Sequence, residues 1–180
     1  MTPFAASIKR YSDWLRSLLE EGAETPFPPA SGKEVARARI EGGLMLTVPI
    51  EGGASRLKRT PVTDLPVSAH GRWQEVHLGA LKAAYGRAPY FAYLFPEIEK
   101  AYREKSGETL KEFNDAIHTI VLRWLSLNPG GIRAIREAVK RDPDRIRTLG
   151  RERKKGIDPD YSILHLLFRL GKESLFVLLS

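Results

Sequence analysis

The chain contains no cysteine, which excludes disulfide bonds, thiolate metal sites and a cysteine nucleophile. It has no apolar run near the roughly 18–20 residues that cross a bilayer. Residues 1–6 are too few and too weakly apolar to form the core of a signal peptide. These absences predict a soluble, cytoplasmic protein. Its 180 residues are enough for one domain with a hydrophobic core.

Several catalytic signatures are also absent. The sequence has no G-x-x-x-x-G-K-[ST] loop for phosphates, no G-x-G-x-x-G dinucleotide fingerprint and no G-x-S-x-G hydrolase elbow. It has no His-x-x-x-His or His-Glu-x-x-His pattern, and no carboxylate cluster with ligand spacing. We therefore expect no bound metal and no other cofactor.

Positive charge is concentrated in one segment, residues 133–156. The whole chain has a net charge of +7. Between Arg133 and Lys155 there are ten basic and four acidic residues, so this stretch alone carries an excess of six. Such a patch can attract phosphates or nucleic acid by releasing counterions. The alternative is a solvated helical face, which the lack of interleaved aromatic residues favours.

The N-terminal half combines one helix with strands. Apolar residues at helical spacing predict a helix over 6–21. Within residues 35–40, Arg37 and Arg39 alternate with Ala36, Ala38 and Ile40, which is the period of a strand. Residues 44–50 are rich in β-forming residues. The glycines of the intervening 41–43 can adopt positive φ, so a hairpin is predicted. A further short strand is expected at 63–67.

Helical periodicity dominates from His70 onward. The predicted elements are helices over 70–85, 90–104 with a break at Pro96, 109–125 and 132–140, a short helix from Asp142-Pro143, an exposed stretch at 151–156, and a last helix capped by Asp160 or Ser162. The sequence thus predicts an α+β fold in one domain, residues 1–180. A small, mostly antiparallel sheet in the N-terminal half would pack against a predominantly helical C-terminal half.

Three segments resemble one known family. Residues 36–53 read ARARIEGGLMLTVPIEGG, residues 73–93 read WQEVHLGALKAAYGRAPYFAY, and residues 161–178 read YSILHLLFRLGKESLFVL. They are similar to the R-N-R-x-x-I … L-T-V-P-V-E-G-G, W-x-x-x-H … A-Y-G-x-x-P-[FY]-F and L-S-I-L-D-L-L-F-N-x-G-P-E blocks of the WbqC-like proteins, especially the Bacteroidetes-type members. The chain therefore resembles a divergent member of the WbqC-like family over most of 36–179.

The sequence departs from that family at polar positions. Val35 and Ala36 stand where the family has Arg-Asn, while His165, Arg169 and Lys172 stand where it has Asp, Asn and Pro. The relatives belong to O-antigen and similar surface-polysaccharide gene clusters. The resemblance therefore implies sugar transfer or sugar decoration, but no particular reaction.

His77 and Arg37 are the main candidates for chemistry. Trp73 and His77 are four residues apart and share a helical face, where a histidine can act as general acid or base. The alternative is a packed Trp73 and a His77 that hydrogen-bonds a carbonyl. Arg37 and Arg39 share a strand face and can bind a carboxylate or diphosphate, Arg37 being the one that matches the family's arginine. Solvated arginines are the alternative.

Aromatic and basic side chains complete the predicted site. Tyr85 and Tyr90 flank Gly86 and Pro89, where they can stack on a sugar or form a satellite core. Substrate binding is thus assigned to Arg37, Trp73, Tyr85 and Tyr90, catalysis to His77, and anion binding to Arg147, Arg151, Arg153 and Lys154.

Three functions remain open. The first is a transferase without metal, or an accessory to one, that acts on a sugar or nucleotide-sugar. It requires Arg37 and His77 to share a cleft. The second is a non-catalytic module whose basic segment binds a phosphate-rich partner such as nucleic acid. The third is a structural family member that works in an oligomer.

Overall fold

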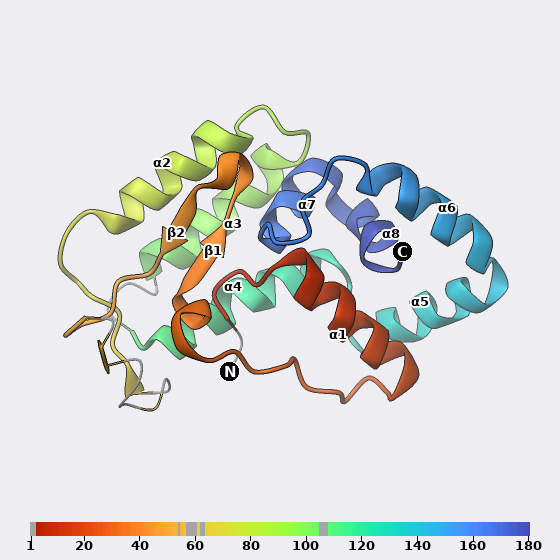
Figure 1. Cartoon of the computed structure of the whole chain (residues 1–180), viewed down its shortest axis with the longest axis horizontal. Coiled ribbons are helices and arrows are strands. Elements are labelled where there is room, and N and C mark those ends of the chain that lie inside the picture. The colour runs from red at the N-terminus through yellow and green to blue at the C-terminus, as the bar shows by residue number, and fades with distance from the viewer. Residues whose placement is uncertain (1–2, 54, 57–60, 62–63, 105–107) are drawn as a thin grey trace.

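The computed structural model describes residues 3–53, 55–56, 61, 64–104 and 108–180, and the predicted α+β fold is confirmed. A two-stranded antiparallel sheet lies in the N-terminal half beside predominantly helical structure (Figure 1). The helices are α1 (Ile8–Glu20), α2 (Trp73–Tyr85), α3 (Phe91–Glu104), α4 (Leu110–Trp124), α5 (Pro129–Arg141), α6 (Pro143–Lys154), α7 (Ile163–Leu170) and α8 (Ser174–Leu178).

The hairpin consists of β1 (Arg37–Arg39) and β2 (Met45–Thr47). Ala38 is opposite Leu46 in the antiparallel register, and both side chains are buried. Gly42 and Gly43 in the turn have φ of 79° and 77°, a conformation that glycine adopts without steric cost. The predicted hairpin is therefore confirmed, although its strands are shorter than expected.

Short 3₁₀ turns and bridges surround the hairpin. The segment before β1 forms a 3₁₀ turn (Gly32–Ala36) rather than a strand, and Glu41–Gly43 and Gly171–Glu173 are 3₁₀ turns as well. Instead of a strand at 63–67, Val67 makes an isolated bridge to Ile50. Thr63, the first residue of that predicted strand, lies outside the described residues.

Helix α7 occupies the centre of the core. Ile163, Leu166 and Phe168 are fully buried. The helix contacts α1, α2, α3 and α4, so it is covered on several sides, which explains why its sequence is apolar nearly all round (Figure 1). Ser162 caps its first turn by accepting a hydrogen bond from Leu164 N–H, one of the two predicted caps.

Two helix predictions were wrong in detail. Helix α3 continues through Pro96, because Pro96 and the turn at Ala92 are exposed and water can satisfy the carbonyl that proline leaves unpaired. Helix α6, predicted as a short helix, extends to Lys154, and the stretch at 151–156 is mostly exposed as predicted. In α2, Val76 follows Trp73 at the three-residue spacing of a core face, yet it is 65% exposed.

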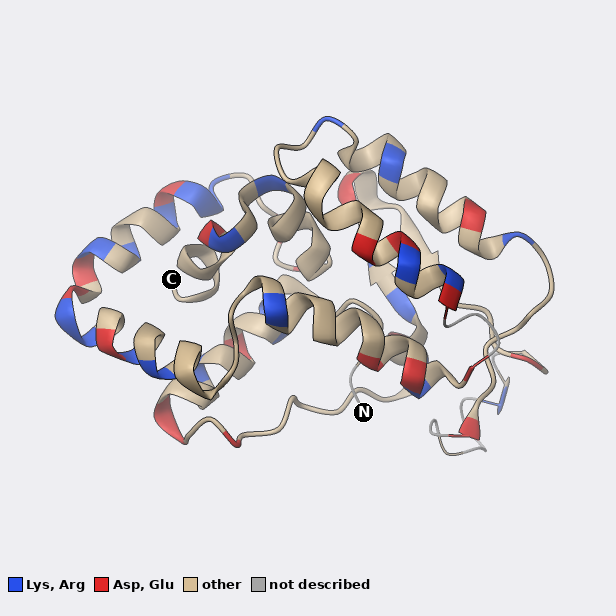
Figure 2. Cartoon of the chain, turned by 180° about the vertical axis from the view of Figure 1, so that it is seen from behind, with Lys and Arg blue, Asp and Glu red and all other residues tan. Residues whose placement is uncertain are grey.

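Helices α5 and α6 diverge from a shared junction at one end of the molecule and carry many of the basic residues (Figures 1 and 2). Asn128 and Asp142 cap them, each accepting a hydrogen bond from a first-turn N–H, and each helix has proline in its first turn. No helix among the described residues is both long enough and apolar enough to cross a membrane.

Gly150 sets how closely α6 approaches α8. A Cβ at this position would overlap the Phe176 carbonyl oxygen, a backbone atom that cannot rotate away. We expect Gly150→Ala to destabilise the protein by about 1–3 kcal/mol through overpacking, although alanine is the better helix former. Urea denaturation measures this change in the free energy of unfolding.

Gly79, in the middle of α2, provides the control. A Cβ there meets no described atom within 4 Å, so Gly79→Ala should stabilise the protein by up to about 1 kcal/mol. Equal effects of the two alanines would contradict the close packing of α6 on α8.

Candidate functional site

A basic cleft lies along the outer edge of β1, with a volume of about 420 Å³. The N-terminal segment before α1, the turn before β1, and the segment before α7 form its walls. The basic cleft is lined by Pro3, Ala5, Ala6, Ser7, Arg10, Lys33, Glu34, Arg37, Ala38, Arg39, Met45, Asp160 and Ser162. Four cationic side chains thus face two carboxylates, which leaves an excess of positive charge.

Two of the four cations already have acidic partners. Arg10 pairs with Glu34 at 3.2 Å and also donates to the carbonyls of Pro28 and Pro29, at 3.0 and 2.9 Å. Arg39 pairs with Asp158 at 3.0 Å. These two guanidinium groups therefore connect the walls of the cleft to one another, and they also contribute positive charge.

The other two cations, Lys33 and Arg37, are unpaired. Both side chains are exposed, and within the described part of the chain neither makes an ion pair or a side-chain hydrogen bond. Arg37 has a planar fork of donors that matches a carboxylate or phosphate, while Lys33 supplies a point charge. The pair is therefore available to an anionic ligand.

The backbone of β1 turns its free edge toward the basic cleft. Val48 N–H donates to Ala36 C=O at 2.8 Å in the ladder with β2. Bonded and non-bonded pairs alternate along an antiparallel ladder, so the backbone groups of Arg37 and Arg39 point away from β2. Ligand atoms in the cleft can therefore reach main-chain donors and acceptors.

Half of those outward groups are already paired. Arg37 N–H donates to Glu34 C=O, and Arg39 C=O accepts from Ser162 N–H at 2.7 Å. Arg37 C=O and Arg39 N–H have no hydrogen-bond partner among the residues that the structure describes. One acceptor and one donor remain, a combination that suits hydroxyl groups.

Two helix N-termini meet at the cleft, those of α1 after Ser7 and α7 after Ser162. Their first N–H groups are already used: Ile8 donates to Tyr161 C=O at 2.8 Å, and Ile163 donates to Ala6 C=O at 2.9 Å. The helix dipoles still place partial positive charge at both ends, which adds to the field of the side chains.

His77 does not share this cleft with Arg37. It is 4% exposed and packs against the rings of Phe4 and Trp73. Its Nδ1 is 3.2 Å from the Tyr102 hydroxyl. Burial lowers the pKa of His77 to about 4, opposed by a weaker hydrogen-bond contribution from the Thr47 backbone. The residue is therefore a neutral core histidine at pH 7.

The three aromatic residues predicted to bind substrate also lie in different parts of the structure. Trp73 is 9% exposed and donates from Nε1 to Ser68 C=O at 3.0 Å, as a core tryptophan does. Tyr85 is 1% exposed and stacks on Phe168 at 4.9 Å. Tyr90 is half-buried and packs on Gly171, at the opposite end of α7 from the cleft. These three side chains do not converge with Arg37.

A polar cluster lies below the hairpin turn. It consists of Glu41, Tyr85, His165 and Arg169, which no sequence pattern groups together. Glu41 N–H donates to the Tyr85 hydroxyl at 2.9 Å, which is 3.4 Å from Nδ1 of His165. Arg169 pairs with the Glu41 carboxylate. Burial, and then the nearby Arg169, lower the pKa of His165. This cluster fastens the turn to α7.

The predicted anion-binding residues of the basic segment differ from one another. Arg153 makes a bidentate pair with Glu173, at 3.0 Å for both bonds, and Arg147 pairs with Asp144 at 3.2 Å. Arg151 and Lys154 are exposed and have no ion pair with any described residue. Only part of the predicted patch is therefore free to bind.

The basic cleft supports binding chemistry more than catalysis. Its acidic groups are Glu34, paired with Arg10, and the exposed Asp160. Its hydroxyl groups belong to Ser7 and Ser162, and both cap helices. Among the described residues no group of three or more histidines and carboxylates is placed to hold a metal ion. Sequence reasoning found Arg37 but missed Lys33 and Arg10, because only the fold brings these residues beside β1.

Comparison with known proteins gives one match. The sequence profile of the WbqC-like protein family matches residues 33–156, which include the hairpin and α2 to α6. No curated protein and no solved structure matches the chain significantly.

Proposed function

The chain belongs to the WbqC-like protein family, and on that premise we propose that its basic cleft binds a phosphate-bearing sugar such as a nucleotide-sugar. The protein then acts in bacterial surface-polysaccharide assembly, as a metal-independent transferase or as an accessory to one. A cytoplasmic location, where nucleotide-sugars are made, goes with this proposal.

One observation supports this function above the others: Lys33 and Arg37 are two unpaired cations among the described residues, and both line a cleft of about 420 Å³. A cleft of this volume lies within the roughly 300–1,000 Å³ of small-ligand sites. The cations suit a diphosphate, and the free Arg37 C=O and Arg39 N–H suit sugar hydroxyls.

A thermal-shift screen of the full chain tests the proposal. A ligand that binds only the folded state stabilises it by about 2.7 kcal/mol at one hundred times its dissociation constant. We expect a nucleoside diphosphate sugar to raise the melting temperature by several degrees, and the parent sugar without phosphate to leave it unchanged. Identical melting curves with every nucleotide-sugar would contradict the proposal.

Nucleic-acid binding by α5 and α6 is the second candidate. It rests on the exposed, unpaired Arg133, Arg145, Arg151 and Lys154, which occur on both helices. If these residues bind phosphates, affinity for a 20-base-pair duplex should fall by at least tenfold between 50 and 200 mM salt. Fluorescence anisotropy measures it. An affinity that is absent at 50 mM, or insensitive to salt, rules this function out.

A further inference from the structure

A second cavity, separate from the basic cleft, lies between α1, α5 and the C-terminal segment, with a volume of about 320 Å³. We call it the apolar cavity. Its lining residues are Arg16, Leu19, Glu20, Arg136, Val139, Lys140, Leu178 and Leu179. It shares no lining residue with the basic cleft, so it is a distinct candidate site.

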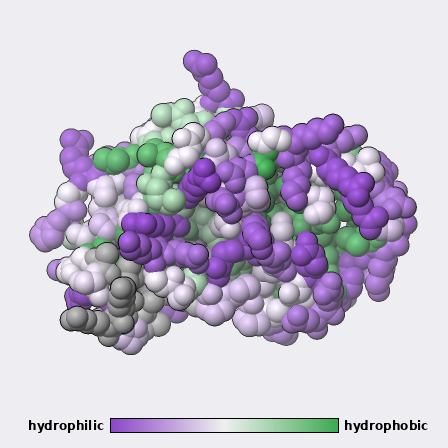
Figure 3. All heavy atoms as spheres, viewed as in Figure 1, coloured by the Kyte–Doolittle hydropathy of each residue, from purple (hydrophilic) through white to green (hydrophobic). Residues whose placement is uncertain are grey.

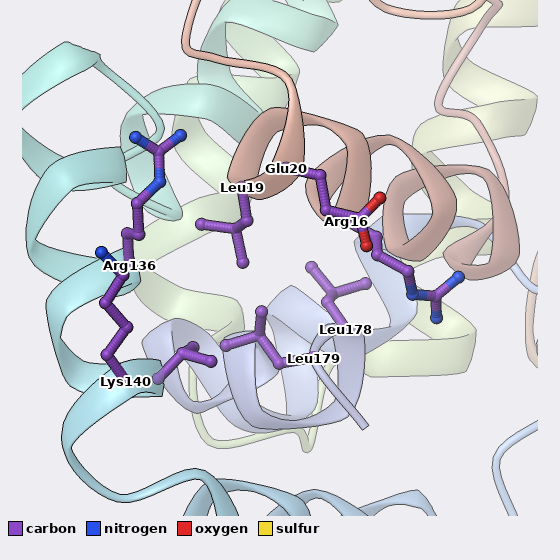
Figure 4. A pocket seen from close by; sticks show the side chains of 8 residues that line it. Arg16, Leu19, Glu20, Arg136, Lys140, Leu178 and Leu179 are labelled. Carbon is purple, nitrogen blue, oxygen red and sulfur yellow. The ribbon is translucent and has the colours of Figure 1, made fainter.

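The centre of the apolar cavity is aliphatic. Leu19, Leu178 and Leu179 point toward one another across it, from α1 on one side and the C-terminal segment on the other (Figure 4). Figure 3 shows hydrophobic residues in a hollow on this end of the molecule, surrounded by hydrophilic ones. Leu19 and Leu179 are only half-buried, so an occupant would remove apolar surface from water.

The cavity exists because α5 packs against the core only near its N-terminal end. Ile132 is its only buried residue, and Arg136 next to the cavity is half-buried. Arg136 donates to the Leu18 carbonyl at 2.9 Å and so holds α5 beside the end of α1. The next turn, with Val139 and Lys140, faces the C-terminal segment across the open space.

The rim is cationic. Arg16, Arg136 and Lys140 stand against one carboxylate, that of Glu20. Arg16 is paired only with Asp13, at 3.3 Å, whereas Arg136 and Lys140 have no acidic partner among the described residues. An apolar floor with a positive rim is complementary to an anionic head attached to a hydrocarbon chain.

We propose that the apolar cavity binds a single-chain amphiphile with an anionic head, either a fatty-acid carboxylate or an alkyl phosphate. The chain lies against the leucines and Val139, and the head lies at the mouth near Lys140. The side chain of Arg16 flanks the chain with its methylene groups while its charge remains in water, and the Arg136 guanidinium stays bonded to the Leu18 carbonyl.

Calorimetric titration of the full chain tests this site, with each amphiphile kept below its critical micelle concentration. Dodecyl phosphate and dodecanoate are the anionic probes, and the tighter of the two identifies the preferred head. Dodecyltrimethylammonium and inorganic phosphate separate the contributions of chain and charge. We expect saturable binding of an anionic amphiphile, and at least tenfold weaker binding of both controls. Equal affinity for the ammonium amphiphile, or no saturable binding of either anion, overturns the proposal.

Variants locate the site. Leu19→Asn should weaken binding by about tenfold or more, because it places an amide on the apolar floor. Lys140→Gln, an exposed and conservative change, should weaken binding several-fold, whereas Lys100→Gln on α3 should leave it unchanged. An unchanged affinity in both Leu19→Asn and Lys140→Gln places any binding elsewhere. Because Lys140 is exposed, its variant remains informative even if Leu19→Asn folds poorly.

Discussion

Replacing Lys33 and Arg37 together with alanine is expected to weaken nucleotide-sugar binding by about a hundredfold or more. A hydrogen bond to a charged group contributes about 1.5–3 kcal/mol, which is roughly tenfold to a hundredfold in affinity for each residue. Both side chains are exposed and unpaired, so the free energy of unfolding should change by less than about 0.5 kcal/mol. Titration calorimetry and urea denaturation measure the two quantities.

A control with the same loss of charge is available on another face. Arg87 and Lys100 are exposed residues after α2 and on α3, outside the basic cleft. Their double alanine variant should bind the ligand as the unmodified protein does. If both double variants weaken binding equally, the effect comes from net charge, and the account of a specific cleft is wrong.

The stability of the protein should fall steeply as the pH decreases from about 6.5 to about 4. Burial lowers the pKa of His77 and of His118 from 6.5 to about 4, so the unfolded chain binds more protons than the folded one in this range. The stabilisation from neutral histidines is complete above pH 6.5 and is lost as the pH falls through 4. The shift corresponds to about 3 kcal/mol for His77, and less for the half-buried His118.

Urea denaturation at pH 7, 5.5 and 4 measures this loss. His77→Gln should lower stability at pH 7 but remove the largest single part of the dependence on pH, because glutamine has no proton to gain. His70→Gln is the matched control, since His70 is exposed. If His77→Gln retains the full dependence on pH, His77 is not the buried neutral group described above.

The sequence predicted those parts of the fold that are determined by local patterns. Turn glycines gave the hairpin, and Asp142-Pro143 gave the start of α6. Local patterns failed where long-range packing decides. Val76 has the periodicity of a core residue, yet α2 buries the neighbouring Leu78 instead, because α7 and α3 cover that side of the helix.

The candidate site was harder to predict, because its parts come from distant segments. Arg37 was identified from its strand, whereas Lys33 and Arg10 have no local pattern that distinguishes them from other surface cations. His77 and Trp73 share a helical face as predicted, but that face is turned into the core. Periodicity shows which residues lie together on a helix, and tertiary packing decides whether that face meets solvent.

The departures from the family pattern in α7 also become clear in three dimensions. His165 and Arg169, which depart from the sequence block that the C-terminal segment resembles, both contact the hairpin region, through Tyr85 and Glu41. These contacts attach α7 to the hairpin turn.

The most direct test of the account is amide hydrogen exchange of the full chain with and without uridine diphosphate glucose. We predict slower exchange in three segments that are far apart in sequence, 5–10, 33–39 and 160–163, because they surround the basic cleft. Protection confined to α5 and α6, or no protection at saturating nucleotide-sugar, would contradict it.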